Sequence, residues 1–362
     1  MVKSDLEFMR MAMHLAGKAR GETSPNPMVG ALIVKDGRIL AQGFHRRCGT
    51  DHAEIVAIKK AKALSRGATL YVTLEPCRHY GRTPPCVERI ISAGIKRVVV
   101  GMKDPNPLMD GKSIAQLREA GIEAKVGVLE KELARLNEVF VKFIQHKMPF
   151  VVAKSAQSID GKIALANGRS EWITSSTARA FAHRLRNDFD AILVGINTIL
   201  IDNPYLNATK KTKKIKKIVV DSQLRLPLKA NIFQQTKPQD IIIATTNRAD
   251  KDRLKNFGRS GVQLMICPGK EEQVDLAWLL RQLAKQEITS VLIEGGAAVI
   301  GSALKAKLVD KMLIYIAPKI LGDSKARNSV EGLSPRSMAE LIELKQIRCR
   351  PISGDFLVEG YL

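Results

Sequence analysis

Two cysteines, Cys77 and Cys86, lie in the stretch EPCRHYGRTPPC, and the sequence HAE precedes them at positions 52 to 54. Such a pair of thiols could form a disulfide, bind a metal ion or act as a nucleophile. The chain has five cysteines, an odd number, and its first twenty residues lack the apolar segment and cleavage site of a signal peptide. We therefore expect a protein of the reducing cytoplasm, where a structural disulfide is the weakest of the three interpretations.

Histidine and cysteine together are typical zinc ligands, and a catalytic zinc site leaves its fourth position to water. The pattern H-x-E, then P-C and a later C, is the signature of zinc deaminases, in which the glutamate does not bind the metal. We predict one zinc ion per chain, bound by His52, Cys77 and Cys86. Zinc would lower the pKa of its water from 15.7 to about 7, and Glu54 would act as the general acid/base that carries a proton to the leaving ammonia.

Other interpretations of this cluster stay open. Two cysteines at this spacing can be incidental, and Glu54 can be a helix N-terminal acid that the helix dipole favours. A structural zinc protein is a further option, although three ligands leave an open position that structural sites avoid. We expect both paired cysteines at helix N-termini, where the dipole favours thiolates. The other cysteines are interpreted as ordinary thiols: Cys48, Cys267 and Cys349.

The first half of the chain alternates the periods of helices and strands. An amphipathic helix is expected at the start, with Ser4 and Glu7 as a capping box. Its predicted apolar face consists of Leu6, Met9, Met13 and Ala16. The further predicted elements are a hairpin over 28–45 that turns at Asp36-Gly37, a helix over 52–64, a strand over 68–76, a short helix after Cys86, a strand over 97–101, a helix over 113–120, a strand over 122–127 and one helix over 130–144.

A second α/β half begins after Met148-Pro149, and a length of 362 residues also suggests two domains. We place the domains at 1–147 and 148–362. The strands predicted in the second half are FVVAKSA, AILVG, KIVV, IIIATT, QLMIC and SVLIE, each with helical sequence nearby. Two alternating segments at the end, LIELKQIRCR and DFLVEGYL, predict an antiparallel hairpin.

The charge balance is strongly basic, with 58 Lys and Arg against 36 Asp and Glu and a net charge of +22. Such a field attracts nucleic acid or phosphorylated small molecules. The densest run, TKKTKKIKK over 209–217, has no interleaved aromatic residues, so it is interpreted mainly as solvated surface and a nucleic-acid partner is not expected. No run of 18 apolar residues exists, so no membrane span is expected.

Eight residues, RHYGRTPP, separate the paired cysteines, whereas deaminases of tRNA or DNA have two. Together with SPNPMVGALIV, GFH and HAE, this first half resembles the bifunctional deaminase–reductase family of riboflavin biosynthesis. The resemblance implies an α/β protein with an N-terminal cytidine-deaminase-like zinc domain. A dihydrofolate-reductase-like domain with a mostly parallel sheet would follow it.

The activity that this resemblance implies has two steps. The first is hydrolytic deamination of 2,5-diamino-6-ribosylamino-4(3H)-pyrimidinone 5′-phosphate. In the second, NADPH transfers a hydride to the anomeric carbon, so that the ribosyl group becomes ribityl and 5-amino-6-ribitylaminouracil 5′-phosphate is formed. The implied partners are these small phosphorylated pyrimidines and further copies of the chain, as a dimer or tetramer.

The resemblance also implies substrate contacts in the first half, namely Asn26, His45, Arg82, Asp104 and Asn106. Their chemistry agrees in part, because an asparagine offers both a donor and an acceptor and an arginine suits a phosphate. Alternatively, the two asparagines only form turns beside prolines, and the histidine is an ordinary hydrogen-bonded residue of the surface.

In the second half, the motif LIEGGAAVIGSAL predicts a strand that ends at Glu294, two glycines and then a helix. Backbone N–H groups at such a helix N-terminus can bind a pyrophosphate, although paired glycines also serve tight packing. No GxGxxG motif follows a strand here, so a dinucleotide-binding Rossmann domain is not supported. The stretches KSAQSIDGKIA, SEWITS, AILVGINTILIDNPYL and VVDSQLRLP resemble the reductase half of the same family.

The NADPH site that this resemblance implies consists of Ala156, Trp172, Thr198, Asp202, Ser222, Gly295, Gly296, Ala297, Ala298, Val299, Ile300, Gly301 and Ser302. The implied contacts of the ribosyl phosphate substrate are Lys154, Ser170, Arg186, Leu206 and Glu294. Asp202 could take part in proton transfer or only cap a helix, and Trp172 could instead be a core residue. The family usually carries an arginine shortly after DNP-x-L, where this chain has Thr209, Lys210 and Lys211, and a lysine lacks the bidentate fork of arginine.

Two rival functions would follow if either the basic charge or the zinc motif were considered alone. The basic charge would suit a polynucleotide base deaminase with a basic tail domain, and the zinc motif alone would suit a free-base or nucleoside deaminase with an unrelated appendage. The eight-residue cysteine gap and the EGGAAVIG segment argue against the polynucleotide deaminase, and the free-base or nucleoside deaminase stays open as the enzymatic alternative.

Overall fold

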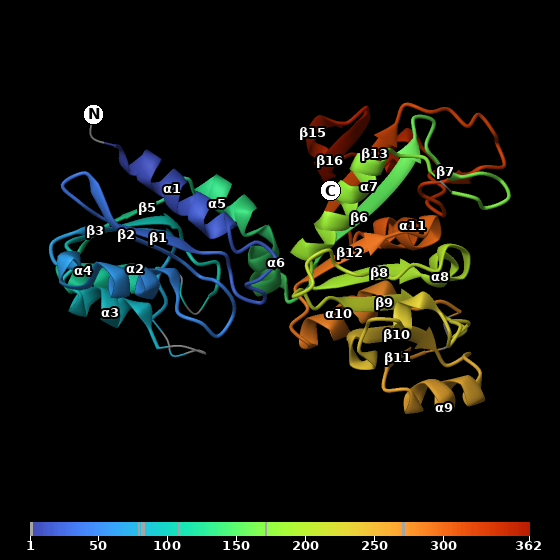
Figure 1. Ribbon diagram of the computed structural model, residues 1–362, viewed down its shortest axis with the longest axis horizontal. Coiled ribbons are helices and arrows are strands. Elements are labelled where there is room, and N and C mark those ends of the chain that lie inside the picture. Colours follow the sequence, from blue (N-terminus) through green and yellow to red (C-terminus); the bar gives the residue numbers. More distant parts are fainter. Residues whose placement is uncertain are drawn as a thin grey trace. The chain divides into compact units, whose positions relative to one another are not determined.

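Each half of the chain folds around a sheet of its own. The computed structural model describes residues 3–78, 80, 84–107, 109, 111–170, 172–269 and 272–362. The chain divides into two compact units, Met1–Lys147 and Met148–Leu362 (Figure 1). Within the described ranges, no helix is long and apolar enough to cross a membrane.

The sheet of the first unit has five strands in the order β2-β1-β3-β4-β5. Their bounds are Gly30–Lys35 for β1, Arg38–Phe44 for β2, Thr69–Leu74 for β3, Arg97–Met102 for β4 and Glu123–Val126 for β5. The β1–β2 hairpin turns at Asp36 and Gly37, as the sequence predicts, and both residues have positive φ. The β1–β2 and β1–β3 pairs are antiparallel, whereas β3, β4 and β5 run parallel.

The helices of this unit are α1 over Asp5–Gly17, α2 over Ala53–Ala61, α3 over Cys86–Ser92, α4 over Lys112–Glu119, α5 over Glu130–Leu136 and α6 over Glu138–His146, and the 3-10 turn η1 spans Lys62–Ser65. The predicted capping box of Ser4 and Glu7 at the start of α1 is confirmed. The predicted apolar face of α1 is wrong at Leu6, which is 41% exposed. The buried face is formed by Phe8, Met9, Ala12, Leu15 and Ala16.

The single helix predicted over 130–144 is interrupted at Asn137, between α5 and α6. Asn137 is buried, and its side chain accepts a hydrogen bond from Met28 N at 2.8 Å and donates one to Met28 O at 3.0 Å. The amide thereby satisfies both backbone groups of a residue just before β1. Because Met28 is distant in sequence, the helical period of 130–144 gives no sign of this break.

The second unit contains a nine-stranded sheet in the order β11-β10-β9-β8-β12-β6-β13-β16-β15. The bounds are Phe150–Ser158 for β6, Ala191–Gly195 for β8, Lys216–Val220 for β9, Ile241–Thr246 for β10, Gln263–Cys267 for β11, Ser290–Glu294 for β12, Lys311–Ala317 for β13, Lys345–Ile352 for β15 and Asp355–Tyr361 for β16. The strands from β11 to β13 are parallel, and the predicted hairpin of β15 and β16 completes the sheet in antiparallel pairing. Strand β13 was not predicted. A separate two-stranded sheet joins β7 over Lys162–Ala164 to β14 over Arg327–Asn328.

Both faces of the large sheet are covered. Successive residues of β8 belong to different apolar clusters, with Leu193 in one and Ile192 in the other, as expected for side chains that alternate across a strand. The helices are α7 over Ser176–Leu185, α8 over Ile196–Asp202, α9 over Lys251–Arg259, α10 over Leu276–Lys285 and α11 over Ala297–Lys305. The 3-10 turns are η2 over Arg186–Asp188, η3 over Asn231–Phe233, η4 over Pro238–Asp240 and η5 over Met338–Glu340. Helices α10 and α11 pack on the first cluster, and α8 and α9 on the second.

A glycine brings α2 close to the sheet of the first unit. A Cβ atom at Gly43 in β2 would lie 2.4 Å from Ala53 O and 2.8 Å from Ala57 N, both in the backbone of α2. The start of α2, where His52 is the N-cap, therefore rests directly on β2. Any larger side chain at position 43 would push this helix away.

We predict that Gly43→Ala lowers the free energy of unfolding of the first unit by about 1–3 kcal/mol, the usual cost of overpacking. It should also weaken zinc retention, because His52 moves with α2. Gly17→Ala is the matched control, since a Cβ there meets nothing within 4 Å. Thermal unfolding and zinc content after competition with a chelator would test this. Equal unfolding temperatures and equal zinc contents for the two variants would show that the close approach of α2 to Gly43 does not matter.

Candidate functional site

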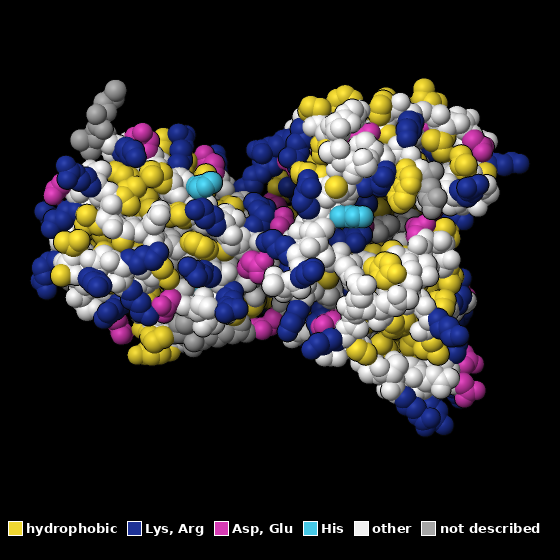
Figure 2. Space-filling model, viewed as in Figure 1, with side chains coloured by type: hydrophobic (Ala, Val, Ile, Leu, Met, Phe, Trp, Pro, Cys, Tyr) yellow, Lys and Arg dark blue, Asp and Glu magenta, His cyan; other side chains and the backbone are white. Residues whose placement is uncertain are grey.

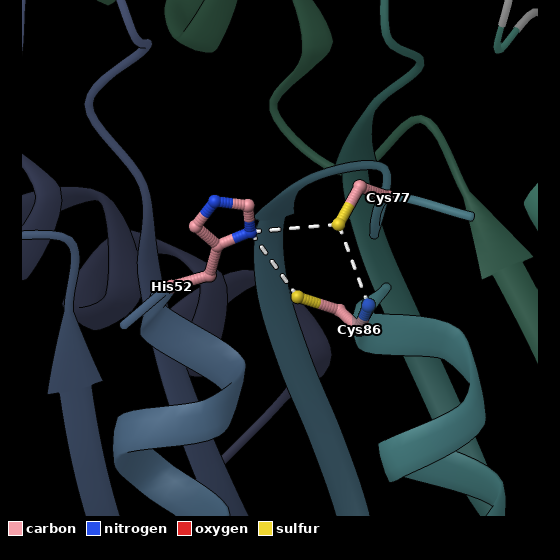
Figure 3. A group of neighbouring side chains, drawn as sticks. All are labelled: His52, Cys77 and Cys86. Atoms are coloured by element: carbon pink, nitrogen blue, oxygen red, sulfur yellow. Dashed lines mark hydrogen bonds between the residues drawn. The ribbon is translucent and has the colours of Figure 1, made fainter. Parts of the chain in front are cut away.

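The three predicted metal ligands converge in the first unit. The ligand atoms of His52, Cys77 and Cys86 all lie within 4.8 Å of one another. His52 Nδ1 is 3.2 Å from Cys86 Sγ and 3.5 Å from Cys77 Sγ (Figure 3). His52 caps α2 and Cys86 begins α3, as predicted, but Cys77 lies in the loop after β3 and not at a helix N-terminus. Instead, the backbone N–H of Cys86 donates a hydrogen bond to Cys77 Sγ at 3.3 Å.

The electrostatics of this cluster favour a thiolate. The thiol of Cys86 and the imidazole of His52 hold the pKa of Cys77 down, at about 4. The hydrogen bond that the Cys86 thiol donates to the sulfur of Cys77, together with burial, raises the pKa of Cys86. The hydrogen bond with Cys77 also raises the pKa of His52. One sulfur is therefore ionised at neutral pH, and the proton held at the other would leave when a metal binds.

Glu54 lies beside this donor set in the first turn of α2. It is only 3% exposed, and its Oε2 has no hydrogen-bond partner among the residues that the structure describes. Burial raises the pKa of Glu54. A buried carboxylate oxygen without a partner is costly unless a ligand or water meets it. One nitrogen and two sulfur donors with this orphaned oxygen beside them fit a zinc-dependent site.

Asn26 and His45 meet next to the cluster. Asn26 Nδ2 is 3.1 Å from His45 Nε2, and His45 Nδ1 is 3.2 Å from Asp51 O. A carbonyl oxygen can only accept, so Nδ1 carries the proton and Nε2 accepts from the amide of Asn26. Burial lowers the pKa of His45, in agreement with this neutral tautomer. The ring of His45 lies 5.3 Å from that of His52, edge to face.

Glu75 organises a loop and was missed by the sequence analysis. The buried carboxylate accepts hydrogen bonds from Ser113 Oγ at 2.6 Å, from Asp104 N at 3.2 Å and from Gly111 N at 3.2 Å. The same loop holds Asn106, whose N–H donates to Asp104 Oδ1 at 2.9 Å. A carboxylate directly after the apolar strand β3, two residues before a metal ligand, was the available signal. Arg82 lies outside the described residues.

The second unit contains a cavity of about 1450 Å³ at the carboxyl ends of its parallel strands. Lys154 of β6, Gly195 of β8, Val220 of β9 and Glu294 of β12 all line it. Ligands of open parallel sheets bind at this edge. The volume exceeds the roughly 300–1,000 Å³ of an ordinary ligand pocket, which leaves room for a cofactor and a substrate together.

Nearly all residues assigned to the second half by resemblance line this cavity, the exception being Gly301. A Cβ at Gly301 would lie 1.6 Å from Glu331 O, so this glycine packs against that segment of backbone. Trp172 is 63% exposed and is not a core residue, and the guanidinium of Arg179 lies 4.1 Å from the centre of its ring. Ser170 Oγ donates to Asp202 Oδ1 at 3.4 Å, at the end of α8.

A buried charge cluster forms one wall of the cavity. Glu294 Oε2 accepts a hydrogen bond from Arg186 Nε at 2.7 Å, and Lys154 Nζ lies 3.7 Å from Glu294 Oε1. Two cations thus share one carboxylate, and the excess positive charge suits an anionic ligand. His183, which the sequence analysis missed, lines the same cavity one helical turn before Arg186. Burial and the nearby Arg186 lower the pKa of His183.

The paired glycines between β12 and α11 have a conformation that suits glycine. Gly295 and Gly296, between β12 and α11, have φ of 116° and 87°, values that other residues rarely adopt. A Cβ at Gly295 would also lie 3.1 Å from Thr198 Oγ1. This turn brings the N-terminal backbone of α11 to the cavity, where N–H groups can bind phosphate.

Figure 2 shows how the basic side chains lie on one face of the molecule. On the face that Figure 2 shows, Lys and Arg side chains are scattered among the other residue types. In the run over 209–217, Lys213 lies 4.0 Å from Asp190, Lys216 pairs with Asp240 at 2.8 Å, and Lys217 is buried. The interpretation of this run as solvated surface is therefore wrong at Lys217.

Both halves of the chain match known families. Residues 2–102 match the model of the cytidine and deoxycytidylate deaminase zinc-binding region, and residues 149–358 match that of the RibD C-terminal domain. The riboflavin biosynthesis protein RibD of Actinobacillus pleuropneumoniae is 42% identical over 357 residues, which cover 98% of this chain and 95% of the relative.

Solved structures agree over the whole length. RibD of Acinetobacter baumannii is 36% identical with a TM-score of 0.89, covering 100% of this chain and 99% of the other. A diaminohydroxyphosphoribosylaminopyrimidine deaminase/5-amino-6-(5-phosphoribosylamino)uracil reductase of Thermotoga maritima is 36% identical with a TM-score of 0.85, covering 99% and 98%.

We predict that the purified protein holds about one zinc ion per chain and that Cys77→Ser loses it, because a neutral hydroxyl replaces a thiolate ligand. Cys267→Ser is the matched control, since Cys267 is a free thiol in an apolar cluster of the second unit. Elemental analysis of both variants would test this. Full zinc occupancy in the Cys77 variant would remove the ligand assignment.

Proposed function

The chain belongs to the RibD family of bifunctional riboflavin-biosynthesis deaminase–reductases, and on this premise we propose how its two halves divide the reaction. Residues 1–147 deaminate the substrate, and residues 148–362 reduce the product of that step. The observation that carries this division is the separation of the two sites. The ligand atoms of the histidine–cysteine cluster belong to the first unit, and the described residues that line the large cavity belong to the second.

We propose that the substrates are those named for the Thermotoga maritima relative: a diaminohydroxyphosphoribosylaminopyrimidine for the first step and a phosphoribosylaminouracil for the second. Both carry a phosphate. The cluster of Lys154, Arg186 and Glu294 supports this choice for the second unit, because its net positive charge faces the cavity.

In the first unit, His52, Cys77 and Cys86 would hold zinc, which would supply a water molecule activated at neutral pH. Glu54 Oε2, buried and unpartnered, accepts a proton from the attacking water and delivers it to the amino group that leaves as ammonia. The side chains of Asn26 and His45 orient the substrate beside the donor set. Their mutual hydrogen bond fixes which atoms donate and which accept.

In the second unit, NADPH would supply the hydride for the ribosyl group. Gly295 and Gly296 allow the start of α11 to approach the phosphates of the cofactor, and Thr198 lies beside them. Arg186 and Lys154, held by Glu294, bind the phosphoribosyl part of the substrate.

Thr209, which stands where the family usually carries an arginine, has a structural role in this chain. Thr209 Oγ1 accepts a hydrogen bond from Asn187 at 2.6 Å, and Lys210 N donates to the same side chain at 2.9 Å. Thr209 is thus tied to the residue that follows Arg186. We assign the phosphate contact to Arg186 and Lys154 instead.

The compartment and the assembly are also part of the proposal. None of the five cysteines, all of them described, forms a disulfide, which suits the reducing cytoplasm.

Strand β15 is an exposed edge of the large sheet and carries Ile347, which is 60% exposed. An edge strand presents backbone N–H and C=O groups with which another chain can pair, and we propose that a second copy covers β15. Light scattering should give a mass above the 39.9 kDa of one chain, and a monomer at micromolar concentration would contradict this.

We predict that Glu54→Gln keeps its zinc and its fold but loses deaminase activity by about 10²–10⁴-fold, because the amide has the same size and cannot carry the proton. Reduction of deaminated substrate by the same variant should be unchanged, which serves as the internal control. Separate assays of ammonia release and NADPH oxidation on the full chain would measure both. Normal deamination by a zinc-loaded variant would show that Glu54 is only a helix N-terminal acid.

A further inference from the structure

A buried lysine lies behind the reductase cavity. Lys217 of β9 is 1% exposed, and its ammonium group donates to Tyr205 O at 2.5 Å, to Asn207 Oδ1 at 2.6 Å and to Thr236 Oγ1. These bonds use all three donors of the group. Among the described residues, no carboxylate lies within ion-pair distance of Lys217, although lysine is rarely buried without one.

The residue between two of these acceptors is strained. Leu206 lines the cavity with φ of 53°, in the left-handed region that a leucine rarely adopts. Lys217 binds the residue before it, through Tyr205 O, and the residue after it, through the side chain of Asn207. A single ammonium group therefore holds both ends of the strained turn.

The same turn reaches the charge cluster of the cavity. Asn207 O accepts a hydrogen bond from Arg186 Nη1 at 3.1 Å, and Arg186 Nε donates to Glu294 at 2.7 Å. The contacts thus run without a break from Lys217 through Asn207 to Arg186. Lys217 itself does not line the cavity, so it cannot touch a ligand there.

We propose that Lys217 is a positioning residue of the reductase, whose ammonium group clamps the turn over 205–207 and thereby fixes Leu206 and Arg186 for the phosphoribosyl substrate. This inference rests on the proposed function of the second unit. A purely structural lysine would affect stability alone, whereas the clamp must also affect the binding of one substrate and spare the cofactor.

The clamp should weaken at alkaline pH. Burial, and then the charge of Arg186 in η2, lower the pKa of Lys217 from 10.5 to about 8, while Asp240 in η4 acts in the opposite direction. Asp240 is itself paired with Lys216. As the pH rises through about 8, Lys217 becomes a neutral amine with two donors for three acceptors. The KM for the phosphoribosyl substrate should then rise in the wild type.

The test compares Lys217→Met with Lys216→Met in the full chain. Lys217→Met keeps an unbranched side chain that is one atom shorter and removes the donors. We expect KM for the phosphoribosyl substrate to rise on the order of 10–100-fold, as for a misplaced binding group. The dissociation constant of NADPH should stay within about twofold and the alkaline rise of KM should disappear. Lys216→Met removes the same charge from the neighbouring position on β9 and should keep the wild-type KM at neutral pH.

Thr236→Val keeps the test decisive if Lys217→Met does not fold. This variant removes one acceptor of the clamp, and it should raise the same KM by a smaller factor. Unchanged KM in a folded variant, or an equal loss of NADPH binding, would overturn the inference. If the wild type itself does not oxidise NADPH with deaminated substrate, the proposed function fails instead, and the two failures are distinguishable.

Discussion

Each of the two sites depends on one carboxylate that is buried away from water. Glu54 and Glu294 are both nearly inaccessible, yet their surroundings differ. One oxygen of Glu54 has no partner among the described residues and lies beside a nitrogen and two sulfur donors, which suits the movement of a proton. Glu294 is held by Arg186 and Lys154, which suits the orientation of two cations. Low local dielectric strengthens both interactions, so each site must be shaped accurately by the backbone around it.

The backbone supplies this accuracy in different ways in the two units. In the first, Gly43 lets α2 rest on β2, and Glu75 ties a distant loop to the strand that precedes Cys77. In the second, parallel strands end at one edge, and two glycines with positive φ bring α11 to the same place. There the strained turn at Leu206 needs support from behind, which the buried ammonium group of Lys217 can give.

Sequence reasoning succeeded where the chemistry is local and failed where distant segments meet. Residue type and spacing brought out the histidine–cysteine cluster, and hydrophobic periods predicted most strands of both sheets. The break between α5 and α6 at Asn137 depends on a hydrogen-bond partner 109 residues away in the sequence. The role of Glu75 depends on hydrogen-bond donors up to 38 residues away. The run of lysines predicts solvated surface at Lys217, whereas its place in the large sheet buries it. Leu6 was misplaced because several faces of α1 carry apolar residues.

The central claim is that one chain carries out two consecutive steps at separate sites. The most direct test gives the purified full chain the phosphoribosylated diaminopyrimidinone together with NADPH, and follows ammonia release and NADPH oxidation over time. We expect one ammonia and one oxidised NADPH for each substrate consumed, with ammonia appearing first. Oxidation of NADPH without ammonia release, or deamination that is never followed by oxidation, would contradict it.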